Sequence, residues 1–179
     1  IKNYKKMISM DLKEIDNFIL IIGKTEGHID QSLFARTILD EKNGPPPEVN
    51  LFNEKNNGES ILNLIDKGYV KSAHDISLGG LLVAISKMCI KGNKGIKISK
   101  SKNLINEIEY FFAEDQGRYL IEVNKEDLKE VTKILNKNSV HHEELGIITQ
   151  NDMIINEKTK VTIDELKSYY TNWLSKFMS

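Results

Sequence analysis

Apolar residues occur along this chain in two patterns, as short continuous runs and as repeats with helical spacing. The run Phe18–Ile22 is apolar at every position and is followed by Gly23, so we predict a strand buried on both faces. Ile96 and Ile98 alternate with lysines, which indicates a strand exposed on one face. Further strands are predicted over residues 69–73, 118–123, 146–148 and 153–155.

Helical patterns lie between these strands. The predicted helices cover residues 32–42 (capped by Asp30 or Ser32), 50–67, 80–90, 104–112, 125–136 and 163–177. Asn124 is the expected N-cap of the fifth helix, and Thr162 with Glu165 forms a capping box for the last. Pro45–Pro47 is a stiff extended connector, and a break or bend of the second helix at 56–58 stays open. The alternation favours an α/β fold, a mixed sheet with flanking helices.

Charge and composition then narrow the function classes. The 179 residues carry 25 Lys and Arg against 26 Asp and Glu, so no basic surplus points to nucleic acid. No apolar run reaches the roughly 20 residues of a membrane span, and no signal-peptide pattern is present. The single cysteine, Cys89, lies in an apolar run and is interpreted as a small buried hydrophobe. We therefore expect a cytoplasmic protein that binds neither nucleic acid nor membrane.

The opening segment, residues 1–16, is polar and starts with Ile1 instead of methionine. We interpret it as an N-terminal connector from a missing upstream domain. Residues 17–179 are then expected to form one domain.

Three polar clusters adjoin predicted strands. The His-Asp turn is His74-Asp75-x-Ser77-x-Gly79-Gly80, the acidic segment is residues 114–118, and the first loop is residues 23–28 with Ser32 at the next helix start. Ligands of α/β sheets tend to sit beyond the strand ends, so a shared crevice is expected. The ligand-contact candidates are His74, Asp75, Ser77, Gly79, Gly80, Glu114, Asp115, Gln116, Arg118 and Ser32.

Each cluster also has a purely structural interpretation. Asp75 or Ser77 would cap the following helix, the two glycines would let that helix pack closely, and His74 would be a satisfied core histidine. The acidic segment would be an ion pair that fixes its own turn. The residues alone leave both interpretations open.

Other sites are not indicated. The first loop lacks the glycine spacing of a phosphate-binding P-loop. The chain has no zinc-ligand spacing, no calcium loop and no nucleophile elbow. No catalytic residue and no metal ligand are therefore assigned within it.

Taken together, the clusters resemble a known family. Residues 73–81 resemble the His-Asp-x-Ser-x-Gly-Gly-Leu signature of the C-terminal domain in the aminoimidazole ribonucleotide synthetase superfamily. Residues 112–119 are similar to the acidic-x-Gln-x-Arg segment of one branch, the synthetase subunit of phosphoribosylformylglycinamidine synthase. The opening strand and loop at 21–25 with Ser32, the proline-rich 44–49 and Trp173-Leu174 also fit that branch. The resemblance extends from about Phe18 to the terminus.

The resemblance implies a domain of an ATP-dependent ligase of purine biosynthesis. Such an enzyme converts formylglycinamide ribonucleotide and ammonia to formylglycinamidine ribonucleotide. ATP and Mg²⁺ would be bound mainly outside this chain, by an upstream ATP-handling domain. A glutaminase subunit would supply the ammonia, and a small bridging subunit would complete the assembly. The chain alone is expected to be inactive.

Two positions depart from the pattern: Leu78 replaces a usual acidic residue, and Asp30 replaces a common glycine. Two alternatives remain. One is a non-catalytic scaffold domain. The other is a different ATP-dependent member of the superfamily, such as selenophosphate synthetase, thiamine-phosphate kinase or a hydrogenase maturation protein, against which the acidic segment and the triple proline argue.

Overall fold

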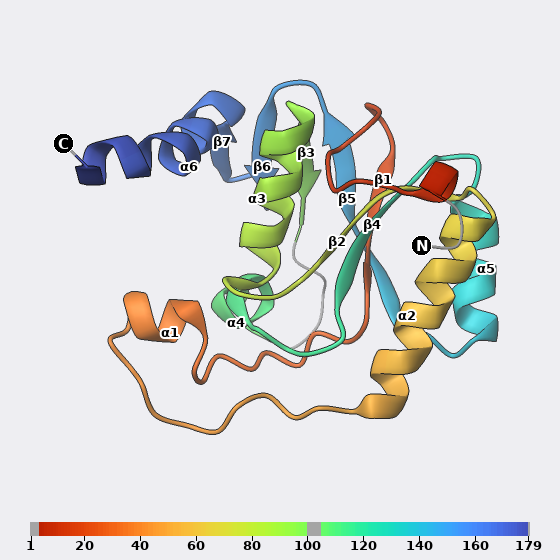
Figure 1. Ribbon diagram of the computed structural model, residues 1–179, viewed down its shortest axis with the longest axis horizontal. Coiled ribbons are helices and arrows are strands. Elements are labelled where there is room, and N and C mark those ends of the chain that lie inside the picture. Colours follow the sequence, from red (N-terminus) through yellow and green to blue (C-terminus); the bar gives the residue numbers. More distant parts are fainter. Residues whose placement is uncertain (1–3, 100–104, 179) are drawn as a thin grey trace.

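A seven-stranded mixed sheet forms the centre of the computed structural model, which describes residues 4–99 and 105–178 (Figure 1). The strand order is β2-β4-β1-β5-β3-β6-β7, and β3 and β6 are the parallel pair among otherwise antiparallel neighbours. The strands are β1 (Phe18–Ile22), β2 (Val70–Asp75), β3 (Gly95–Ile98), β4 (Tyr119–Val123), β5 (His142–Thr149), β6 (Asp152–Ile155) and β7 (Thr159–Thr162). The predicted α/β class with a mixed sheet is confirmed.

Helices cover both faces of the sheet (Figure 1). They are α1 (Leu33–Thr37), α2 (Leu51–Asp66), α3 (Gly80–Gly92), α4 (Glu107–Phe112), α5 (Leu128–Lys137) and α6 (Ile163–Met178), with a short 3-10 turn at Tyr4–Lys6. The α3 and α4 helices lie on one face, and α2 and α5 lie on the other.

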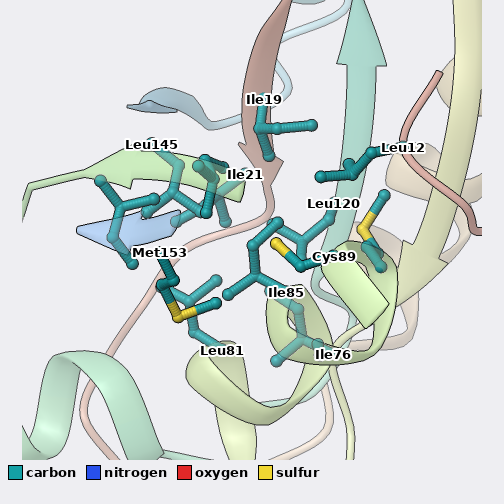
Figure 2. Packing of buried hydrophobic residues seen from close by; sticks show 14 of the residues in the cluster. Leu12, Ile19, Ile21, Ile76, Leu81, Ile85, Cys89, Leu120, Leu145 and Met153 are labelled. Carbon is teal, nitrogen blue, oxygen red and sulfur yellow. The ribbon is translucent and has the colours of Figure 1, made fainter. Parts of the chain in front are cut away.

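The alternation of side chains along β1 explains why its sequence is apolar throughout. Ile19 and Ile21 point into the cluster under α3, which includes Leu81, Ile85 and Cys89 (Figure 2). Leu20 and Ile22 point into the opposite cluster, formed with α2 and α5. These four side chains are fully buried, as the sequence predicted, while Phe18 at the start of β1 is only partly buried.

A buried carboxylate anchors the N-terminal segment to the sheet. Glu122 on β4 is fully buried and accepts hydrogen bonds from the backbone N–H groups of Lys13 and Glu14 at 2.9 and 3.0 Å. Asn17 Nδ2 and Ser72 Oγ also donate to it, each at 2.7 Å. Four donors compensate for the loss of solvation of this carboxylate. The link from residues 1–16 to an upstream domain stays a prediction.

The first helix is shorter than predicted. Ser32 does cap it, accepting from Ala35 N at 3.1 Å, but α1 ends at Thr37 instead of Lys42. Ile38 and Leu39 were expected on its buried face, yet they are 68% and 46% exposed. A helix this short depends on packing for its stability, and these two exposed side chains supply too little of it to extend α1.

Other boundaries also differ from the sequence predictions. Asn124 does not cap α5, which begins at Leu128, because residues 124–127 form a turn in which Asp127 N donates to Asn124 O. The α2 helix continues without a break through 56–58, because Asn57 is buried and its side chain donates to Gly117 O in the turn before β4. Strand β7 was not predicted, and β5 starts four residues earlier than expected. The predicted helix start at 104 lies outside the described residues.

Candidate functional site

A cleft of about 620 Å³ lies at the end of the sheet where β1 finishes and β4 begins. Its walls come from the first loop, the end of the proline-rich connector, the first two turns of α2, the acidic segment and the connection from α5 to β5. The size falls within the range of small-molecule sites, roughly 300–1,000 Å³. Of the predicted ligand contacts, Asp115 and Gln116 line this cleft.

Asp115 acts as an anchor for the first loop. Its Oδ2 accepts from the backbone N–H groups of Glu26 and Gly27 at 3.0 and 3.2 Å, and its Oδ1 accepts from His28 N at 3.0 Å. The residue is 5% exposed. Three amide donors therefore fix the shape of the loop that forms one wall of the cleft.

Arg118 contacts both Asp115 and the first loop. The residue is 1% exposed, and its guanidinium lies 3.7 Å from the Asp115 carboxylate while donating to Thr25 Oγ1 and Ala113 O. Burial lowers the pKa of Arg118, and the neighbouring Asp115 opposes that change. The pair is a structural ion pair in geometry, and Arg118 does not line the cleft.

Glu114 joins two helix starts. Its Oε1 accepts from Leu33 N at 2.7 Å and from Gly79 N at 2.8 Å, so one carboxylate oxygen satisfies the first turns of both α1 and α3. Its own backbone N–H donates to His28 O. The three polar clusters predicted from the sequence therefore do meet, and Glu114 is where they meet.

The His-Asp turn lies beside the cleft without lining it. His74 and Asp75 extend β2 beyond its predicted end, and His74 Nδ1 lies 3.0 Å from Asp75 Oδ1. His74 Nε2 is buried and has no hydrogen-bond partner among the described residues. Burial raises the pKa of Asp75, but hydrogen bonds from its own backbone, from Ser77 and from His74 outweigh that effect and lower it.

The two glycines of the turn serve close packing. Gly79 is the N-cap of α3 at φ +87° and makes no side-chain cap, so neither Asp75 nor Ser77 caps this helix. Gly80 has φ +71°, and a Cβ there would lie 2.7 Å from the carbonyl oxygen of Ala113. This close contact is with the end of α4 and not with the sheet.

Several cleft residues were missed by the sequence analysis. Asn53, Glu54 and Asn57 face the cleft from α2, and His141 faces it from the connection just before β5. Residues 50, 53, 54 and 57 do have helical spacing, but polar residues surround them along the first half of α2, so the sequence offered no distinct signal for this side of the helix. Leu78 and Asp30, the two departures from the family pattern, do not line the cleft.

The charges of the lining do not form a phosphate cradle. Four carboxylates (Glu26, Glu48, Glu54 and Asp115) face one lysine and two histidines, and Lys24 is already paired with Glu26 at 2.8 Å. The side-chain amides of Asn53, Asn57 and Gln116 can both donate and accept. The cleft therefore suits neutral polar groups, such as amides and hydroxyls, better than a bare anion.

Two further searches bear on the site. Within residues 4–99 and 105–178, no group of three or more His, Cys, Asp or Glu side chains is arranged to hold a metal ion. Among the same residues, no helix is long and apolar enough to cross a membrane.

Fold and motifs together define the class of this domain. The chain belongs to the family described as AIR synthase related protein, C-terminal domain, whose model matches residues 15–156. The superfamily resemblance read from the motifs is confirmed.

Relatives then narrow the family to one branch. The chain is 64% identical over 178 residues to "Phosphoribosylformylglycinamidine synthase subunit PurL" of Pelagibacter ubique, covering 99% of this chain and 24% of the relative. It is 35% identical over 176 residues to the PurL of Bartonella henselae, covering 98% of this chain and again 24% of the relative. The chain thus spans about a quarter of the length of these curated relatives.

A solved structure has the same fold. "T. maritima PurL complexed with FGAR" matches with a TM-score of 0.77 at 20% identity, covering 91% of this chain and 30% of that one.

Proposed function

We propose that this chain is the C-terminal domain of a PurL-type ligase, which joins ammonia to formylglycinamide ribonucleotide at the cost of ATP. In that reaction ATP phosphorylates the carbonyl oxygen of the glycinamide group, and ammonia displaces the phosphate from that carbon to give formylglycinamidine ribonucleotide, ADP and phosphate. The observation that carries the proposal is the 64% identity to a PurL subunit along 178 residues.

The domain's own contribution is to shape a crevice wall. The side chains of Asp115, Arg118 and Glu114 form hydrogen bonds to backbone groups, and Asp115 also pairs with Arg118. These contacts position the first loop. Gln116 is exposed and lines the cleft, which makes it the side chain of the acidic segment that is free to meet a ligand. ATP and Mg²⁺ are bound mainly by an upstream ATP-handling domain, and ammonia comes from a glutaminase subunit joined through a small bridging subunit.

The test uses the full-length reading frame that contains this chain. Purified full-length protein, supplied with ammonium, ATP, Mg²⁺ and formylglycinamide ribonucleotide, is expected to form the amidine, measured by mass spectrometry with ADP release as a second readout. The 179-residue chain alone is expected to form none. Amidine formation by the chain alone would show that the chemistry resides here, and an inactive full-length protein would overturn the family function.

A second candidate is a scaffold domain whose clusters serve packing alone. The observation that favours it is that nine of the ten predicted contacts, all except Gln116, already have structural partners or tight backbone packing.

Gln116→Ala in the full-length enzyme distinguishes the two functions. A raised KM for the ribonucleotide substrate or weaker ADP binding, with unchanged thermal stability, supports the ligand crevice. Unchanged kinetics and unchanged ADP titration support the scaffold. Asp75→Ala provides the comparison on the His-Asp turn, where no cleft contact exists and no kinetic change is expected.

A further inference from the structure

The last helix, α6, is anchored at its beginning only. Thr162 and Glu165 form the predicted capping box, in which Thr162 N donates to Glu165 Oε2 at 2.9 Å and Glu165 N donates to Thr162 Oγ1 at 3.2 Å. Ile163 is buried in the core under α3, Leu166 packs against it, and Lys167 Nζ donates to Asn93 Oδ1 at the end of α3. This first part of the helix belongs to the domain.

Beyond Lys167 the helix leaves the domain. Every described side chain from Ser168 onward is exposed, and α6 extends away from the sheet to the C-terminus in Figure 1. An isolated helix shorter than roughly 12–15 residues is marginal in water. The segment Ser168–Met178 has no tertiary packing of its own here, and its helical structure would therefore be stabilised by a contact outside this domain.

The exposed part carries an aromatic face. Tyr169, Trp173 and Phe177 follow one another at four-residue steps and are 78%, 60% and 79% exposed. The rings of Trp173 and Phe177 lie 6.4 Å apart, and the neighbouring Tyr170 and Met178 are also exposed. Large aromatic side chains gathered on one face are typical of a contact surface, because each removes much apolar area from water when covered.

The comparisons show that α6 belongs to a longer protein. The family model matches residues 15–156, so the helix lies outside the matched part. The PurL relatives nevertheless match this chain over 178 and 176 residues, and they are about four times as long. The helix therefore belongs to the PurL-length polypeptide and not to the common domain.

We propose that the aromatic face of α6, formed by Tyr169, Trp173 and Phe177, docks against another domain of the same longer polypeptide. The inference rests on the proposed function in one respect, namely that this chain is part of a PurL-length protein. The capping box and the Ile163 anchor fix where the helix leaves this domain, so docking also fixes how the domain sits against its neighbour.

The test is thiol accessibility in the full-length protein. Tyr169→Cys places a thiol on the aromatic face, and Ser168→Cys places one about 100° around the helix from it, beside the polar Thr171 and Asn172. Alkylation is followed by mass spectrometry of the C-terminal peptide, so that other cysteines do not interfere. We expect the Tyr169→Cys thiol to react at least about tenfold more slowly than the Ser168→Cys thiol, at any protein concentration and with no other protein added.

Equal rates at the two positions would overturn the proposal. Protection that depends on protein concentration would assign the face to a second copy, and protection that requires another protein would assign it to a separate subunit. Either result also overturns it. Amidine formation is measured in the same preparation, so loss of the proposed function is recognised separately from loss of docking.

A second measurement avoids a cysteine in the contact. Hydrogen exchange of the C-terminal peptide in the full-length protein is compared between wild type, Trp173→Ala and Ser168→Ala. Alanine is the better helix former, so helix propensity alone predicts slower exchange in both variants. Faster exchange in Trp173→Ala alone supports docking, and the absence of that increase contradicts it.

Discussion

The hydrogen bonds around Asp115 predict a large loss of stability for one isosteric change, Asp115→Asn. The amide has a single acceptor oxygen where the carboxylate has two. If its NH₂ group takes the place of Oδ1, it faces the His28 N–H; if it takes the place of Oδ2, it faces the N–H groups of Glu26 and Gly27. In either orientation at least one backbone donor at this buried site loses its partner.

The magnitude follows from the contacts that are lost. An unsatisfied buried donor costs about 1–3 kcal/mol. The remaining bonds also lose their charge assistance, and Arg118 at 3.7 Å loses its carboxylate partner while keeping its bonds to Thr25 and Ala113. We expect a total of about 2–4 kcal/mol in the free energy of unfolding.

Urea denaturation followed by circular dichroism measures this quantity. Gln116→Asn is the matched control, because it shortens the neighbouring side chain, which is exposed, and is expected to change stability by less than about 0.5 kcal/mol. The first loop of Asp115→Asn should also show faster amide hydrogen exchange at residues 26–28. If Asp115→Asn is as stable as Gln116→Asn, the anchor assigned to Asp115 is wrong.

Three further predictions follow from other buried positions. Glu122→Gln is expected to destabilise the chain by about 2–4 kcal/mol, because an NH₂ group replaces one carboxylate oxygen and then faces two hydrogen-bond donors. Glu144→Gln, an exposed control, is expected to have little effect in the same urea titration. Gly80→Ala should lower the melting temperature because its Cβ meets the backbone of α4, whereas Gly58→Ala, in open space within α2, should raise stability by about 0.5–1 kcal/mol; the reverse order of melting temperatures would refute the packing argument. Burial raises the pKa of the Cys89 thiol to about 12, above its value in the unfolded chain, so stability is unaffected by this group at neutral pH and declines as pH rises toward that value. Iodoacetamide at pH 8.5 should therefore leave native Cys89 unmodified and label it in urea, as read by mass spectrometry, and rapid labelling of the native chain would contradict its burial.

Local sequence signals determined much of this protein. The continuous apolar run at Phe18–Ile22 required a strand covered on both sides, and the Ser32 and Thr162 caps determined two helix starts because a cap depends on neighbours three residues away. The ordered motifs were enough to identify the family, since their residue types and spacing are visible without a fold.

Only the tertiary structure decided how those motifs are used. The sequence favoured a structural pair for Asp115 and Arg118 only slightly over ligand contacts, and their burial against the first loop selects the pair. The cleft itself depends on α2 residues such as Asn53 and Asn57, which lie about sixty positions from the acidic segment and meet it across the end of the sheet. Long-range contacts of this kind, like the early end of α1 and the four donors on Glu122, are set by packing between distant segments, and no local pattern in the sequence encodes them.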